Sequence, residues 1–288
     1  MTRFAHFLAH NGEPQLAEVS GNSLVPLEGI SKLGHETTPE VIAAAKRLEG
    51  AAVREVDVRL LPASPAPGKV ICVGLNFASH VEEVEREMPD YPVLFTKFAS
   101  NLVGPSDDIV IPTTSTGPDY EGEMAVIIGR GGRHIAKADA LDHVLGYSVA
   151  NDVSMRDYQY KSHQWLQGKA WDNSTPLGPH IVTPDEVDLE TAGIRTTVNG
   201  RTLQDARMSM MLFSVPALIA TVSEFTRLDA GDVILAGTPA GIGSKRDPKV
   251  TLRDGDVVTV EIDGIGRIEN TVVSDSSVST SSEGRVRR

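Results

Sequence analysis

The chain has 288 residues, a formal net charge of -12, 40% hydrophobic and 23% charged residues, and one cysteine. This composition is typical of a globular enzyme with a sizeable core, and the acidic balance argues against nucleic-acid binding through a basic surface. The single Cys72 excludes a disulfide framework and a cysteine-based metal site. No apolar stretch reaches the ~18 residues of a membrane span, and the first residues lack a signal-peptide pattern, so we expect a cytoplasmic protein without a membrane partner.

The N-terminal quarter of the chain predicts a few strands and one helix. Residues 3–27 contain short apolar runs on either side of an Asn-Gly turn at Asn11, which indicates short strands. Thr37 and Glu40 have the spacing of a capping box, and the residues up to Leu48 are good helix formers. We therefore expect a helix in this region.

A proline-rich segment, 59–68, contains three prolines and is interpreted as a linker. The C-terminal segment is rich in serine and is predicted to be disordered. The predicted units are a small N-terminal α+β domain at 1–65, a larger domain at 66–273 and a tail at 274–288.

The larger domain is predicted to consist mainly of strands. Asn199-Gly200 indicates a tight hairpin turn, and Ser214 is the predicted N-cap of an amphipathic helix that reaches Phe225. Because helices are few and the strands are short, the pattern favours a β-rich α+β fold over a regular series of βαβ units. The expected strands are 69–73, 108–111, 123–128, 145–150, 193–198, 232–236 and 257–262.

Three acidic residues stand beside two of these strands. Glu121 and Glu123 point to the same face of a strand, because side chains alternate along it. Two carboxylates at the start of a buried strand are costly unless a positive charge lies between them. Together with Asp152, which follows the strand at 145–150, they could hold a hard divalent cation. A solvated, acidic strand end explains the same spacing, so the pattern alone leaves both interpretations open.

His80 and Glu83 are three residues apart in the segment that follows the strand at 69–73. If this segment is helical, the two side chains are neighbours on one face. A carboxylate beside a histidine orients the ring and raises its basicity, which suits the activation of water. A surface helix rich in glutamate would bring them together by accident, so this pair is ambiguous as well.

Basic and polar residues provide candidate substrate contacts. Arg156 lies one helical turn after Asp152 and could pair with a bound carboxylate, although a structural ion pair explains it as well. Lys169 could bind an oxyanion, although a lone lysine is usually solvated. The Gly-rich segment around Thr238 follows a strand and could hold a carboxylate, or form only a tight turn.

Five motifs occur in the order Gly-Leu-Asn-Phe-Ala-Ser-His (74–80), Asp-Tyr-Glu-Gly-Glu (119–123), Asn-Asp-Val-Ser-Met-Arg-Asp (151–157), Gly-Lys-Ala-Trp-Asp (168–172) and Gly-Thr-Pro-Ala-Gly-Ile-Gly (237–243). With them the chain resembles the fumarylacetoacetate hydrolase family over residues 69–273. The segment from Tyr158 to Lys169 resembles in particular its acylpyruvate and fumarylpyruvate hydrolases. Phe77 stands where the family often has Tyr, and Trp171 where Phe is frequent.

The resemblance implies a mixed β-roll catalytic domain, usually a homodimer, with a Mg²⁺ or Mn²⁺ ion in a site that Ca²⁺ also fits. It also implies a role for each candidate residue: metal ligands Glu121, Glu123 and Asp152, a catalytic set of His80, Glu83 and Lys169, and substrate contacts from Arg156, Gln159 and Thr238.

The expected function is hydrolysis of a C–C bond in a 3-acylpyruvate such as fumarylpyruvate, in the catabolism of aromatic compounds. His80 and Glu83 would activate the water for this reaction. The alternative is isomerisation of 2-hydroxyhepta-2,4-diene-1,7-dioate or 5-carboxymethyl-2-hydroxymuconate, or decarboxylation of an oxaloacetate-type acid, on the same metal site without a water nucleophile. A non-enzymatic protein that binds a keto or diketo acid is the third interpretation.

Overall fold

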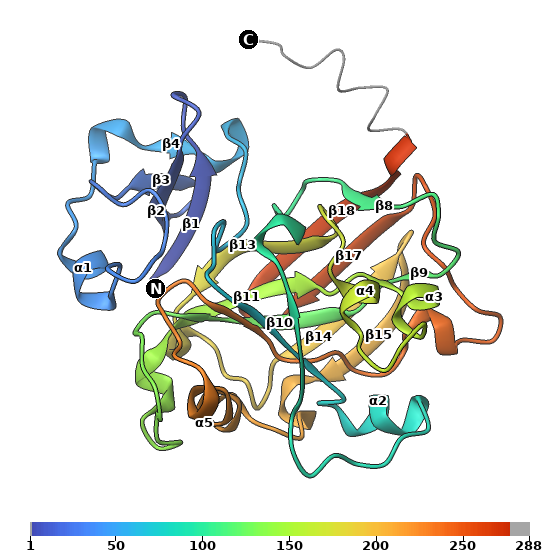
Figure 1. Ribbon diagram of the computed structural model, residues 1–288. Coiled ribbons are helices and arrows are strands. Elements are labelled where there is room, and N and C mark those ends of the chain that lie inside the picture. Colours follow the sequence, from blue (N-terminus) through green and yellow to red (C-terminus); the bar gives the residue numbers. More distant parts are fainter. Residues whose placement is uncertain (1, 277–288) are drawn as a thin grey trace.

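Two β-sheets form the framework of the computed structural model, which describes residues 2–276 (Figure 1). The larger sheet has 11 strands, and the smaller one has 5. The β-rich α+β fold expected from the sequence is therefore confirmed. Among the residues described, no helix has the length and apolar character needed to cross a membrane.

The larger sheet has the strand order β4 (Val53–Arg54), β3 (Ser23–Pro26), β2 (Pro14–Ser20), β1 (Arg3–Leu8), β13 (Thr175–Val182), β11 (Val144–Asn151), β10 (Gly122–Ile128), β16 (Val233–Leu235), β5 (Val70–Gly74), β6 (Val93–Lys97), with β7 (Leu102–Val103) beside β13. The smaller sheet has the order β15 (Arg201–Arg207), β14 (Gly193–Val198), β17 (Val257–Ile262), β18 (Gly266–Ser274), β8 (Ile109–Ile111). A separate pair consists of β12 (Ser154–Met155) and β9 (Pro118–Asp119). The helices are α1 (Pro39–Ala44), α2 (Ala78–Glu83), α3 (Arg156–Gln159), α4 (Leu166–Lys169) and α5 (Val215–Phe225).

The expected strands of the larger domain are all present, with ends displaced by at most one residue. The turn between β14 and β15 has positive φ angles at Asn199 (52°) and Gly200 (76°), as a tight hairpin turn requires. Helix α5 begins after Ser214, as predicted. Strands β6, β13 and β18 were not predicted.

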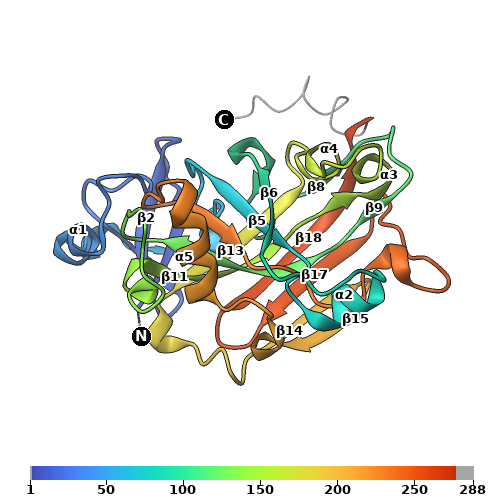
Figure 2. The same cartoon turned by 60° about the horizontal axis from the view of Figure 1, so that its bottom comes forward.

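Strand β10 is buried along its whole length because it packs on both faces. Met124, Val126 and Ile128 belong to a cluster that includes α5 and the smaller sheet, and α5 lies across this face of the larger sheet (Figure 2). Ala125 and Ile127 belong to a second cluster on the opposite face. The central position of β10 explains its uninterrupted apolar sequence, and it makes the start of this strand a rigid place for a site.

The N-terminal strands continue the larger sheet at one edge (Figure 1), because β1 pairs with β13 through Phe4 and Ile181. The proline-rich segment 59–68 is packed against the same strands: Leu61 N donates to His6 O at 2.8 Å, and Ala63 is fully buried. The segment is thus not a free linker, and the division of the chain near residue 65 stays a prediction.

Helix α1 is shorter than expected and begins one residue later. Its N-cap is Thr38, whose hydroxyl accepts a hydrogen bond from Val41 N, and it ends at Ala44. The capping box at Thr37 and the helix up to Leu48 were therefore wrong. The physical reason is tertiary pairing: Leu48 N donates to Pro26 O at 2.9 Å, so the chain leaves the helix to run beside β3.

The predicted tail lies mostly outside the described residues. Strand β18 reaches Ser274, so the ordered chain extends to the start of this predicted unit. Residues 277–288 are outside the described part of the chain, and the prediction of disorder there is untested.

Candidate active site

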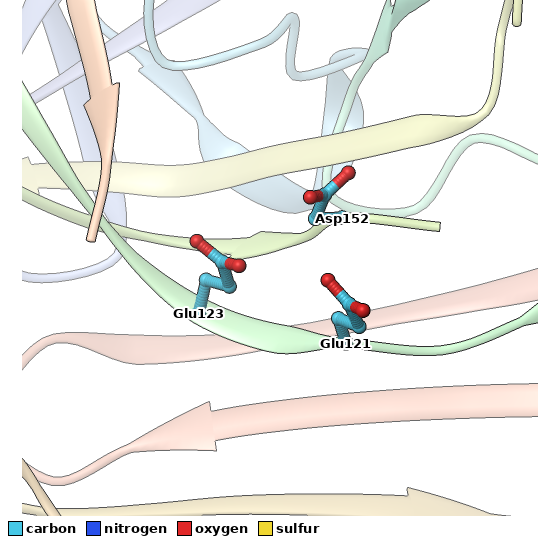
Figure 3. Close-up of side chains that lie close together, drawn as sticks. All are labelled: Glu121, Glu123 and Asp152. Atoms are coloured by element: carbon cyan, nitrogen blue, oxygen red, sulfur yellow. The ribbon is translucent and has the colours of Figure 1, made fainter. Parts of the chain in front are cut away.

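Glu121, Glu123 and Asp152 converge where β10 and β11 lie side by side, and Figure 3 shows both glutamates on one side of β10, facing Asp152. Gly122 is opposite Asn151 in the antiparallel pair, so the residue after β11 lies beside the start of β10. All three residues are buried, at most 5% exposed. Each offers a ligand atom, and these atoms lie within 4.8 Å of one another. The acidic residues expected from the sequence thus form one cluster.

Two buried lysines balance part of this negative charge. Lys169 Nζ donates to Glu121 Oε2 at 2.6 Å and to Asp152 Oδ2 at 2.8 Å. Lys97, from β6, lies 2.7 Å from Asp152 Oδ1 and donates to Val153 O at 3.0 Å. Lys97 was not predicted as a site residue. Strand β6 itself was not predicted, and a single lysine carries no sequence pattern that marks it as buried.

Glu123 differs from the other two carboxylates. Gly237 N donates to Glu123 Oε2 at 2.8 Å, but within residues 2–276 no lysine or arginine forms an ion pair with it. Burial raises the pKa of Glu123 well above its ordinary value, and the negative charges of Asp152 and Glu121 raise it further. A divalent cation would supply the missing positive charge, and oxygen ligands are those that Mg²⁺, Mn²⁺ and Ca²⁺ prefer. The donor set therefore fits such an ion.

Glu121 and Lys169 hold each other in the charged state. Burial opposes the charge of Glu121, but Lys169 and Arg156 outweigh it and lower the pKa of this carboxyl to about 2. Burial also opposes the charge of Lys169, but Asp152 and Glu121 outweigh it and raise the pKa of the lysine above its ordinary value. At neutral pH the site thus contains a charged ammonium that can donate hydrogen bonds.

Arg156 is held by protein carboxylates. Its Nε donates to Asp119 Oδ2 at 2.8 Å, Nη2 lies 2.7 Å from Glu121 Oε1, and Nη1 donates to Gln159 Oε1 at 2.9 Å. Asp119 was not predicted as a site residue, although it begins the Asp-Tyr-Glu-Gly-Glu motif. It also accepts from Gly243 N at 2.8 Å. The side chains of Arg156 and Gln159 are hydrogen-bonded to each other. Their contacts with a substrate stay predictions.

His80 and Glu83 lie on α2, so the helix on which their contact depends is confirmed. His80 Nδ1 is 3.2 Å from Glu83 Oε2. The other carboxylate oxygen of Glu83 accepts a hydrogen bond from Gly241 N at 2.8 Å. Glu83 therefore fixes the imidazole and ties α2 to the Gly-rich segment at the same time. A role of this pair in activating water stays a prediction.

Thr238 ties the Gly-rich segment to the start of β10. Its hydroxyl donates to Gly122 O at 2.9 Å and accepts from Gln204 Nε2 at 2.7 Å. Gln204 was not predicted, because it comes from the hairpin strand β15, far from Thr238 in the sequence. The Thr238 hydroxyl thus donates its proton to a backbone carbonyl. A contact between Thr238 and a substrate stays a prediction.

One pocket joins these groups. All the predicted site residues except Glu83 and Asp152 line it, together with apolar side chains and one further arginine, Arg86. The apolar part comes from Val73, Leu75, Val84, Phe95, Trp165 and Ile242. Apolar walls around a few buried charged groups are typical of a binding site for a small ligand.

Comparisons with known proteins point to a single family. Residues 69–273 match the family model described as fumarylacetoacetate (FAA) hydrolase C-terminal. The mitochondrial oxaloacetate tautomerase fahd2 of Xenopus laevis is 48% identical over 220 residues, which cover 75% of this chain and 69% of that protein. The mitochondrial oxaloacetate tautomerase FAHD2A of Homo sapiens is 46% identical over 220 residues, covering 75% and 70%.

Two solved structures share the fold over nearly the whole chain. The 2-hydroxyhepta-2,4-diene-1,7-dioate isomerase from Mycobacterium marinum has a TM-score of 0.81 and 33% identity, covering 96% of this chain and 99% of that one. The fumarylacetoacetate hydrolase from the psychrophilic Exiguobacterium antarcticum has a TM-score of 0.83 and 36% identity, covering 95% and 100%. The motifs, the site and these matches lead to one conclusion: the chain belongs to the fumarylacetoacetate hydrolase family of enzymes.

Proposed function

We propose that this protein is a metal-dependent isomerase that interconverts the keto and enol forms of a 2-keto acid, with oxaloacetate as the first substrate to test. The observation that carries the proposal is the buried Lys169 ammonium, 2.6 Å and 2.8 Å from two of three clustered carboxylates. The names of the Xenopus and human relatives support oxaloacetate, and that of the Mycobacterium marinum neighbour supports isomerisation. Isomerisation therefore comes before the hydrolysis expected from the sequence.

When bound at Glu121, Glu123 and Asp152, a divalent cation supplies Lewis-acid chemistry to the oxygens of a 2-keto acid. Lys169 keeps its proton at Nζ and donates a hydrogen bond to the substrate oxygen on which negative charge develops. Its raised pKa makes it a donor at neutral pH rather than a base. The apolar walls limit water around this charge, which strengthens the interaction.

Ketonisation also moves protons: C3 of the enol gains one, and the enol oxygen loses one. His80 lines the pocket, and its Nδ1 is beside Glu83, so Nε2 is the nitrogen that exchanges a proton with the substrate. We assign the proton transfer at carbon to His80 and the orientation of the ring to Glu83. Arg156 and Gln159 are assigned to the substrate carboxylate.

Hydrolysis of a 3-acylpyruvate is the second candidate, and the contact between His80 and Glu83 is the observation that favours it. Here His80 would take a proton from water, and the water oxygen would attack the distal carbonyl carbon. The C–C bond then breaks, the electron pair goes to the enolate of pyruvate, and that enolate is protonated. The products are pyruvate and a carboxylic acid, so this reaction consumes water and isomerisation does not.

Assembly and compartment belong to the same proposal. The family resemblance supports a homodimer. The sequence predicts a cytoplasmic location, whereas the Xenopus and human relatives are described as mitochondrial.

The experiment adds enol-oxaloacetate to the purified protein with Mg²⁺ or Mn²⁺ and follows the decay of the enol absorbance in the ultraviolet. We expect decay faster than in buffer, loss of the acceleration with a chelator, and no change in the number of substrate carbons. Fumarylpyruvate and simpler acylpyruvates are tested in parallel. Cleavage of these with release of pyruvate, and no effect on the enol, would put hydrolysis first. Stoichiometric binding without turnover of any substrate would contradict both reactions.

A further inference from the structure

Arg86 lines the pocket with His80 and Lys169 but has no part in the chemistry described above. It is exposed, and within residues 2–276 its side chain has no hydrogen bond or ion pair. Lys169 and Arg156, by contrast, are both held by buried carboxylates. Arg86 is therefore a cation of the pocket without an ion-pair partner among the described residues.

The backbone of Arg86 is fixed by the end of α2. Glu85 has a positive φ of 56°, and Arg86 N donates to Val81 O at 3.1 Å. A residue in the left-handed region followed by this longer hydrogen bond is a common way to end a helix. The chain turns sharply after Glu83, and the side chain of Arg86 starts from a defined point at the edge of the pocket.

Arg86 also lines a second, neighbouring cavity, and it shares this position with Phe95, Tyr160 and Trp165. Phe95 and Trp165 contact each other edge to face, with ring centroids 5.5 Å apart, and both rings line both spaces. The other residues of the outer cavity come from β6 and from the segment 162–164. No aspartate or glutamate lines this outer cavity, and its titratable groups are Arg86, Tyr160 and His163.

We propose that Arg86 is a specificity-determining residue that binds the distal carboxylate of a dicarboxylic 2-keto acid. The inference rests on the proposed function for the keto end of the ligand, which Lys169 and the three carboxylates would receive. The unpaired guanidinium of Arg86 borders the outer cavity, which has no acidic lining residue. It therefore favours an anionic group at the distal end of the ligand, and its planar fork matches a carboxylate. Among 2-keto acids this assignment favours the diacids, the class to which oxaloacetate belongs, and it names the residue that would recognise their second carboxylate.

The test uses binding rather than turnover, on the full chain with Mg²⁺ present. Calorimetry compares two matched pairs of ligands: 2-ketoglutarate with 2-ketovalerate, and 2-ketoadipate with 2-ketohexanoate. Within each pair the carbon number and the keto end are the same, and only one member has a distal carboxylate. We expect the unaltered protein to prefer at least one diacid, and Arg86→Gln to weaken binding of that diacid by about 5- to 10-fold without changing the monoacid.

The matched control is Arg253→Gln, which removes the same charge at an exposed position that does not line this pocket. It should bind all four ligands like the unaltered protein. Equal binding of diacid and monoacid, or a preference that Arg86→Gln retains, would overturn the role of Arg86 and leave the proposed function standing. Failure of every ligand to bind would also overturn the role of Arg86, whereas the proposed function is decided separately by the assay with enol-oxaloacetate.

Discussion

Asp152 illustrates how single residues balance charge in this site. It is fully buried, and each of its carboxylate oxygens has a cationic partner: Lys97 at Oδ1, 2.7 Å away, and Lys169 at Oδ2, 2.8 Å away. Removing one partner of a buried ion pair leaves a charge without compensation, which costs more than the pair itself contributes. Lys97 lies outside the pocket lining, so we interpret it as a residue that positions Asp152.

Replacing Lys97 by methionine tests this interpretation. The variant keeps the length of the side chain but leaves Asp152 with one cation, so we expect the free energy of unfolding to fall by about 3 kcal/mol. Urea unfolding at neutral pH without divalent ions measures the change. Lys137→Met, at an exposed position, is the matched control and should be neutral. A Lys97→Met variant as stable as its control would show that Asp152 does not depend on this lysine.

Site residues could be predicted from the sequence where their partners are close in the sequence, and not where the partners are distant. Glu121 and Glu123 could be paired from the alternation along one strand, and His80 with Glu83 from the spacing of one helix. Asp119 and Lys97 could not, because their partners Arg156 and Asp152 are distant in the sequence. No local pattern reports such a contact, and a lysine is ordinarily expected at the surface.

At the scale of secondary-structure elements, a buried histidine lies where β1 packs against the proline-rich segment 59–68. His6 is fully buried, and its Nδ1 lies 2.7 Å from Ala63 O. Burial lowers the pKa of His6 from 6.5 to about 4, although the carbonyl of Ala63 works in the other direction. The folded protein therefore keeps this ring neutral where the unfolded chain would bind a proton.

This shift predicts a loss of stability in acid. The contribution of neutral His6 is complete above pH 6.5 and is lost as the pH falls from 6.5 to about 4, by roughly 3 kcal/mol. In His6→Gln the free energy of unfolding should fall less steeply over this range, as measured by urea unfolding at several pH values. His10→Gln, an exposed neighbour, should keep the original slope. Equal slopes in all three proteins would refute the role of His6.

The elements that were missed have clear physical reasons. Strand β13 contains Pro176 and Pro179, and prolines ordinarily argue against a strand inside a sheet. Strand β18 alternates buried and exposed residues, but its core face includes Asn270, which donates to the carbonyls of Gly104 and Asp107. Helix α1 ended early because pairing with β3 outweighed helix propensity.

At the scale of the whole molecule, an acidic protein is proposed to bind acidic ligands. The net charge of -12 would repel them, so local positive charge has to attract them: the unpaired Arg86 in the pocket and the divalent ion proposed at the three carboxylates. The fold class could be predicted from the many short strands. The order of strands could not, since neighbours such as β1 and β13 are far apart in the sequence.

The central claim is that Glu123, with Glu121 and Asp152, holds the divalent ion on which enolisation depends. Its most direct test is the exchange of the C3 protons of oxaloacetate with deuterium from D₂O, followed by NMR with Mg²⁺ present. We predict that the protein accelerates the exchange over buffer and that Glu123→Gln reduces this acceleration by at least about 100-fold and weakens Mn²⁺ binding, while Glu82→Gln, at an exposed position of α2, changes neither. Acceleration that persists in Glu123→Gln, or after removal of divalent ions, would contradict the account.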